Sequence, residues 1–136
     1  MIHLEVQAHI FKLAQVYPGI TEIWLIGSRA NGNARIDSDW DLLMFADSET
    51  FLEITKRPEF KQPGVDLLVV YDNLHFQEPW PESADGYEPK TGALRGLGEW
   101  DWERISDVDA TYTGTKVING MPTMQTKKAI RLWPLT

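Results

Sequence analysis

Residues 27–43 read GSRANGNARIDSDWDLL, and this stretch is the most informative part of the sequence. A short apolar run, residues 23–26, comes just before this stretch, and a second apolar run begins within it and ends at residue 45. We predict a buried strand for residues 23–26 and another for residues 39–45, because short apolar runs bounded by turn residues are typical of strands inside a sheet. Residues 28–34 are expected to form a short helix after a tight turn at Gly27.

Two acids, Asp39 and Asp41, stand two positions apart on the second predicted strand. Side chains two apart on a strand leave the same face, so both carboxylates point one way and Trp40 points the other. Two ionised carboxylates repel each other by about 1 kcal/mol in water and by more in a shielded cleft. A divalent cation relieves that repulsion, and oxygen ligands suit Mg²⁺. The pair therefore indicates a metal site.

A third acid, Asp66, interrupts the apolar residues 65–71, for which we predict a third strand. A charge inside such a strand is costly unless it has a partner. If this strand lies beside the second one, Asp66 joins the acidic pair. Gly27 and Ser28 begin the short helix, where free backbone N–H groups favour a phosphate. Three carboxylates and a phosphate cradle are what two-metal phosphoryl or nucleotidyl transfer requires.

The order of these residues resembles a known signature. Gly27-Ser28, then Asp39-x-Asp41, then a strand Asp66 is similar to the pattern of the DNA polymerase beta-type nucleotidyltransferase superfamily. The Gly-Ser-Arg-Ala start and the Asp-Ser-Asp-x-Asp-Leu end resemble its minimal bacterial members, which include antitoxins that transfer AMP onto partner toxins. The resemblance covers residues 20–71. It implies an α+β fold with a short mixed β-sheet and helices packed on one face.

The resemblance also implies two sets of site residues. The catalytic residues, which would hold Mg²⁺ or Mn²⁺, are Asp39, Asp41 and Asp66. The residues that would bind the phosphates of the nucleotide are Gly27, Ser28 and Arg29. The chain departs from the family at one position, because small members often carry a basic residue where this chain has Asn31 before Gly32.

The implied activity is transfer of a nucleoside monophosphate, expected to be AMP from ATP, to a hydroxyl acceptor with release of pyrophosphate. A protein acceptor or a pocket built by a homo-oligomer is favoured over a small molecule or an RNA end. The net charge of −7 argues against a nucleic-acid partner. The alternative is an antitoxin-like module that docks on a small helical toxin, with weak or lost catalysis. A metal-dependent phosphohydrolase is the third interpretation.

The rest of the chain fits one domain, residues 1–136, which is an ordinary domain length. Val6, Ile10, Leu13 and Tyr17 recur at helical spacing. A second helix is expected from Asp47 or Ser48 to about residue 56. Residues 77–98, rich in proline and glycine, are expected to form a long functional loop.

The C-terminal part, about residues 99–133, is expected to form strands. Residues 100–104 and 112–118 are predicted to pair as a β-hairpin that turns near residues 107–109. Residues 127–133 fit a strand or a short helix, and their basic side chains would contact a triphosphate, a partner or only solvent. His75 is a candidate for proton transfer, and Trp80 is a candidate for stacking on a base or a partner.

The composition excludes several classes of protein. The absence of cysteine rules out disulfides, thiol catalysis and cysteine-ligated zinc. No apolar run approaches the roughly 20 residues that cross a bilayer, and the first residues lack the pattern of a secretory signal. We therefore expect a cytoplasmic protein that makes no contact with a membrane.

Overall fold

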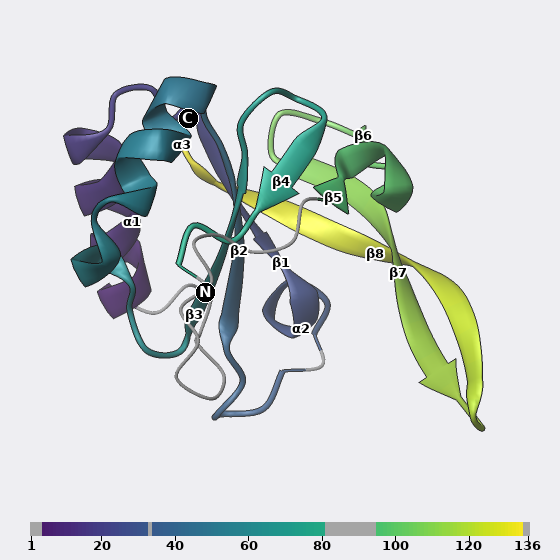
Figure 1. Ribbon diagram of the computed structural model, residues 1–136. Coiled ribbons are helices and arrows are strands. Elements are labelled where there is room, and N and C mark those ends of the chain that lie inside the picture. The colour runs from purple at the N-terminus through teal and green to yellow at the C-terminus, as the bar shows by residue number, and fades with distance from the viewer. Residues whose placement is uncertain (1–3, 33, 81–94, 135–136) are drawn as a thin grey trace, which may run out of the picture.

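The computed structural model describes residues 4–32, 34–80 and 95–134. A mixed eight-stranded sheet in the order β5-β4-β3-β2-β1-β8-β7-β6 runs through this part of the chain (Figure 1). The strands are β1 (Glu22–Ile26), β2 (Trp40–Phe45), β3 (Val65–Val70), β4 (His75–Gln77), β5 (Arg95–Gly96), β6 (Glu103–Arg104), β7 (Asp109–Ile118) and β8 (Met121–Trp133). The helices are α1 (Leu4–Val16), α2 (Gly27–Ala30) and α3 (Ser48–Thr55), with short 3-10 helices η1 (Pro58–Phe60) and η2 (Leu97–Trp100). The architecture is thus a mixed sheet with a few helices, in agreement with the sequence prediction at this level.

Strands β1, β2 and β3 occupy the centre of the sheet. Strand β1 pairs antiparallel with β2, and β2 pairs parallel with β3. A parallel pair needs a crossover connection, and α3 supplies it here. Along the parallel pair, Asp41 lies directly opposite Asp66.

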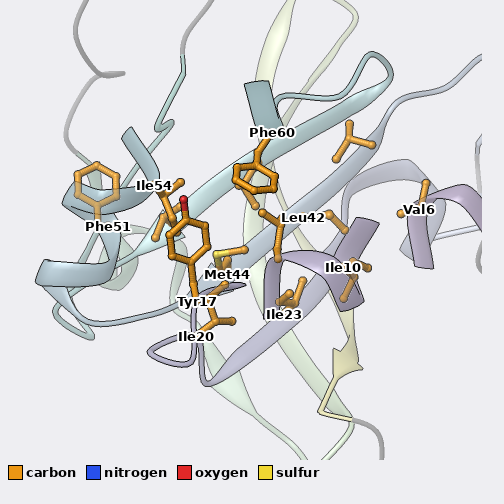
Figure 2. Packing of buried hydrophobic residues seen from close by; sticks show 14 of the residues in the cluster. Val6, Ile10, Tyr17, Ile20, Ile23, Leu42, Met44, Phe51, Ile54 and Phe60 are labelled. Carbon is orange, nitrogen blue, oxygen red and sulfur yellow. The ribbon is translucent and has the colours of Figure 1, made fainter. Parts of the chain in front are cut away.

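Helices α1 and α3 cover one face of this centre. The buried residues of α1 are Val6, Ile10 and Leu13, which follow the helical spacing of the sequence. The side chains of Ile10 and Ile54 gather with Leu42 of β2 in one core between the helices and the sheet (Figure 2). Helix α3 begins after Asp47, whose carboxylate accepts a 2.7 Å hydrogen bond from the Thr50 N–H. Both helices therefore form where apolar spacing and a capping residue predicted them.

The opposite face of the sheet carries a second core. Alternate residues of β2, Leu43 and Phe45, point to this face and meet Phe76 of β4 and Tyr112 of β7 in one cluster. Strands from the two ends of the sheet therefore share a core, so the sheet curls over this face. The ring of Trp102 packs against this cluster, and its centroid lies 5.7 Å from that of the Phe45 ring.

Strands β7 and β8 form a long antiparallel hairpin that projects from the rest of the molecule (Figure 1). We call this hairpin the arm. Its turn is Asn119-Gly120, and both residues have positive φ, 52° and 77°. That dipeptide is the strongest short-range signal for a two-residue hairpin turn. At its base the arm joins the sheet, because β8 pairs with β1 and β7 pairs with β6.

The C-terminal part differs from the sequence prediction in two respects. Residues 112–118, which were predicted to pair with residues 100–104, pair with β8, and β6 pairs only with Ala110 and Thr111 of β7. Residues 100–104 were expected to be a strand, but η2 extends to Trp100 and the strand is limited to Glu103–Arg104. Asp101 adopts a left-handed conformation with φ 49°, which interrupts an extended chain. Trp100 and Trp102 nevertheless both pack against the second core, on the same side, as they would in an alternating strand. Residues 127–133, which the sequence left open, are part of strand β8.

The predicted loop, residues 77–98, is described only at its ends. Gln77 closes β4, and Arg95–Gly96 form the short strand β5 beside it. Residues 81–94 lie outside the described residues, so the prediction for them stays a prediction. Within the described part of the chain, every helix is too short or too polar to cross a bilayer.

Candidate active site

A pocket of about 620 Å³ opens on the curled face of the sheet. Asp41 and Asp66 line it from neighbouring central strands, and Lys127 lines it from the arm. The aromatic rings of Trp100 and Tyr112 also face it, and they stack on each other with centroids 5.3 Å apart. The pocket therefore combines carboxylates, one ammonium group and an aromatic surface.

Asp41 and Asp66 form the acidic side of the pocket. They are opposite one another in the parallel register, and both line the pocket. Burial, followed by the charge of Asp66 and hydrogen bonding to its side chain, raises the pKa of Asp41 from 3.8 to about 6, while Lys127 opposes the shift. Two neighbouring carboxylates repel each other less when one is protonated or when a cation lies between them. The pair is consequently a place for one proton or for a cation.

Asp39 lies apart from this pair. It precedes β2, its side chain is exposed, and it lines a neighbouring pocket together with Arg29 and Trp40. Its charge nevertheless contributes to the raised pKa of Asp41. Among the described residues, no three acidic or histidine side chains come close enough to hold a metal ion. Two carboxylates still fit Mg²⁺, which proteins commonly hold by one or two carboxylates together with substrate phosphates.

The turn at Gly27 touches the acidic pair. Gly27 has a φ of 72°, and a Cβ built there would overlap a carboxylate oxygen of Asp41. Glycine thus allows both the left-handed backbone and the close approach to the carboxylate. The Gly27 N–H donates a 2.8 Å hydrogen bond to the Tyr112 hydroxyl. Helix α2, which begins here, has only four residues.

The segment that contains this turn is similar to a known family. Residues 8–63 match the family model described as polymerase beta, nucleotidyltransferase. The chain resembles the polymerase beta-type nucleotidyltransferase superfamily. The match covers less than half of the 136 residues and indicates nucleotidyl transfer at the level of the superfamily. No curated protein and no solved structure matches the chain.

The nucleotidyltransferase match includes part of the predicted site. It spans Gly27, Ser28, Asp39 and Asp41, and it ends before Asp66. Asp66 is linked to the matched segment by the pairing of β2 with β3, which places it against Asp41. Ser28 is half-buried and is absent from the residues that line the pocket within the described part of the chain.

Arg29, predicted to bind phosphate in a nucleotidyltransferase site, braces the neighbouring loop in this structure. Its Nη2 donates hydrogen bonds to the carbonyls of Ile36, at 3.2 Å, and Ser38, at 2.8 Å. Its guanidinium group lies 4.5 Å from the centroid of the Trp40 ring. Arg29 therefore holds the segment that leads into β2 and lies outside the pocket that contains the acidic pair.

Asn31, where the chain departs from the nucleotidyltransferase pattern, ties the turn to the arm. Its Nδ2 donates to the carbonyls of Gly27, at 2.8 Å, and Lys128, at 3.1 Å. Its Oδ1 accepts a 2.8 Å hydrogen bond from the Lys128 N–H. Where small members of the family often carry a basic residue, this chain therefore has an amide that makes three hydrogen bonds to the backbone. These bonds hold α2 against β8.

Sequence reasoning missed several residues of the pocket. The pocket is also lined by Tyr112, Glu78 and Glu99. All three lie outside the segment that matches the family, so the sequence pattern does not point to them. One signal was available, since the Asn-Gly turn at residue 119 sets the register that places Tyr112 opposite Lys127.

Two other candidates lie elsewhere. His75 is bonded to Asp72 through its Nδ1, at 2.7 Å, and follows β3 at the end opposite to Asp66. Trp80 donates from Nε1 to the Ile54 carbonyl, at 2.7 Å, and packs against the helix-side core. Neither residue lines the pocket of the acidic pair, and both predicted roles stay predictions.

Proposed function

We propose that the protein is a metal-dependent nucleotidyltransferase that moves AMP from ATP to a hydroxyl acceptor. The observation that carries the proposal is the contact between Asp41 and Asp66 across two parallel strands, in a pocket whose first carboxylate belongs to the matched segment. A pocket of about 620 Å³ is large enough for one nucleotide-sized ligand.

The acidic pair would hold Mg²⁺ or Mn²⁺. When bound, such an ion polarises the α-phosphate and favours the ionised form of the attacking hydroxyl. The chain itself contributes orientation and a proton acceptor. The acceptor oxygen forms a bond to the α-phosphorus, the bond from that phosphorus to the bridging oxygen breaks, and pyrophosphate leaves. The acceptor proton passes to a carboxylate of the pair, for which Asp66, exposed toward the pocket, is the candidate.

Asp39 has an outer role in this proposal. Its carboxylate acts on Asp41 through its charge from the neighbouring pocket, whereas Asp41 and Asp66 are the direct ligands. The acceptor is proposed to be a hydroxyl group on a protein, presented at the mouth of the pocket. The rival function, partner binding with lost catalysis, is disfavoured by the retained carboxylate pair.

The test uses ATP, GTP, CTP and UTP labelled at the α-phosphate, with Mg²⁺ or Mn²⁺ and candidate acceptor proteins. Label on the acceptor and pyrophosphate in solution are expected, whereas orthophosphate would indicate a phosphohydrolase. Asp41→Asn and Asp66→Asn should each lower the rate by about 10²-fold or more, the usual loss when a group that stabilises transition-state charge is removed. Asp39→Asn should lower the transfer rate by a smaller factor.

The control is Asp37→Asn, which changes an exposed acid of the same loop outside the pocket. It should transfer at the wild-type rate. Undiminished transfer by Asp41→Asn or Asp66→Asn, with both variants folded, would refute the assigned role of the pair.

A further inference from the structure

The pocket carries much more negative than positive charge. Four carboxylates line it, those of Asp41, Asp66, Glu78 and Glu99. Among the described residues that line it, Lys127 is the only cation. A nucleoside triphosphate adds further negative charge, so any site for it here needs cationic groups aimed at the phosphates.

The positive charge comes from the C-terminal part of the sequence. Residues 110–136 contain four basic residues and no acidic one, although the whole chain has a net charge of −7. The arm therefore brings positive charge to the edge of an acidic body. Lys127 is the member of this basic set that lines the pocket.

Gly114 leaves room for the Lys127 side chain. A Cβ built at Gly114 would lie 2.7 Å from Cε of Lys127 and 3.0 Å from its Cδ and Nζ. Gly114 does not have a positive φ, so the backbone alone does not call for glycine at this position. The close contact gives a different reason for it, because any larger residue would push the lysine stem away from its present path.

The turn at Gly27 is poorly placed to bind phosphate by itself. Its N–H is engaged by the Tyr112 hydroxyl, and α2 is only four residues long. The Lys127 ammonium, in contrast, makes no hydrogen bond or ion pair with a described residue, so it is available to a ligand.

We propose that Lys127 binds the phosphate chain of the nucleoside triphosphate and that Gly114 is a positioning residue that holds Lys127 in the pocket. This inference rests on the proposed function, since it assumes a nucleotide in the same pocket. It assigns to the arm the phosphate contact that the sequence pattern placed at the turn.

The first test measures binding of ATP and of inorganic tripolyphosphate by isothermal titration in Mg²⁺. Lys127→Met keeps most of the length of the side chain and removes its charge, and it should weaken the binding of both ligands by about tenfold or more. Lys127→Arg should restore most of the affinity. Lys128→Met is the matched control, because Lys128 is exposed and meets Asn31 only through its backbone.

The second test isolates the positioning role. Gly114→Ala should weaken tripolyphosphate binding when Lys127 is present. In the Lys127→Met variant, the same substitution should not lower the affinity any further. Gly98→Ala is the control, since a Cβ there has no neighbour within 4 Å among the described residues. Melting temperatures verify that each variant is folded.

The outcomes separate this inference from the proposed function. If the wild type transfers AMP and Lys127→Met binds ATP with unchanged affinity, the inference fails and the proposed function stands. A further loss from Gly114→Ala in the Lys127→Met background overturns the positioning role. A wild-type protein that binds neither ATP nor tripolyphosphate overturns both proposals.

Discussion

Gly27 and Asp41 are in contact at the edge of the pocket. A Cβ built on Gly27 would overlap the Oδ2 atom of Asp41 and lie 3.0 Å from its Cγ. The turn and the carboxylate therefore occupy adjoining space, and each limits where the other can be. Four predictions concern this turn, its ties to the arm and the acidic pair.

Replacing Gly27 with alanine should displace the Asp41 carboxylate. Gly27→Ala adds a side chain at a φ of 72°, a conformation that costs a residue with a Cβ about 1–2 kcal/mol, and it also creates the clash with Asp41. Nucleotide transfer should fall well below the wild-type rate. The measurement compares rates and melting temperatures of the two proteins.

Gly32→Ala is the control for this prediction. Gly32 has a similar φ of 75°, but a Cβ there meets no described atom within 4 Å. It should lose similar stability from the backbone and keep most of the activity. Equal loss of activity in both variants would contradict a specific contact between Gly27 and Asp41.

Removing the Tyr112 hydroxyl should loosen the turn. Tyr112→Phe keeps the ring that stacks on Trp100 but removes the acceptor of the 2.8 Å bond from the Gly27 N–H. A lost hydrogen bond that leaves its partner unpaired costs about 1–3 kcal/mol. Chemical denaturation should show a lower free energy of unfolding. Tyr71→Phe, whose hydroxyl makes no hydrogen bond with a described residue, should be nearly neutral.

Truncating Asn31 should break the hydrogen bonds that join the turn at Gly27 to strand β8 of the arm. Asn31→Ala removes two donated bonds and the acceptor for the Lys128 N–H. Hydrogen exchange at the Lys128 amide should accelerate, whereas the Arg131 amide, bonded to the Val108 carbonyl, should keep its protection. Asn31→Asp keeps the acceptor and should protect the Lys128 amide partly. An unchanged exchange rate at the Lys128 amide in the alanine variant would show that Asn31 does not hold the arm against the turn.

The acidic pair should make stability depend on pH and on divalent cations. The pKa of Asp41 is about 6 in the folded protein against 3.8 for the free group, so the folded state binds this proton more tightly. Its stabilising contribution is complete below about pH 4 and is lost as the pH rises through 6. Above pH 6 the ionised pair should destabilise the fold, and Mg²⁺ should restore stability by binding it.

The measurement is the melting temperature at pH 5 and pH 8, with and without Mg²⁺. The increase caused by Mg²⁺ should be larger at pH 8, because protons compete with the ion at pH 5. Asp41→Asn should raise the melting temperature at pH 8 without Mg²⁺ and abolish the increase with it. Asp37→Asn should behave as the wild type. An equal effect of Mg²⁺ at both pH values would exclude a site on ionised Asp41.

Local patterns determined much of the central fold. The helical spacing of Val6, Ile10 and Leu13 predicted α1, the cap at Asp47 predicted α3, and short apolar runs predicted β1, β2 and β3. The alternation of β2 also predicted that Trp40 and Asp41 leave opposite faces, as they do. These features depend on neighbours in the chain, so the sequence carries them directly. The roles of the site residues stay predictions.

Tertiary structure alone decided how the pocket is completed. Nothing local reveals that β8 pairs with β1, that Tyr112 accepts a bond from Gly27, or that Asp39 lines a neighbouring pocket. Residues 100–104 show the same limit, because the 3-10 helix η2 and the left-handed backbone of Asp101 interrupt the alternating pattern. Sequence periodicity fixes the direction of a side chain relative to its own strand. The partner across the sheet depends on which distant strand buries the most apolar surface beside it, and that is settled only when the whole chain folds.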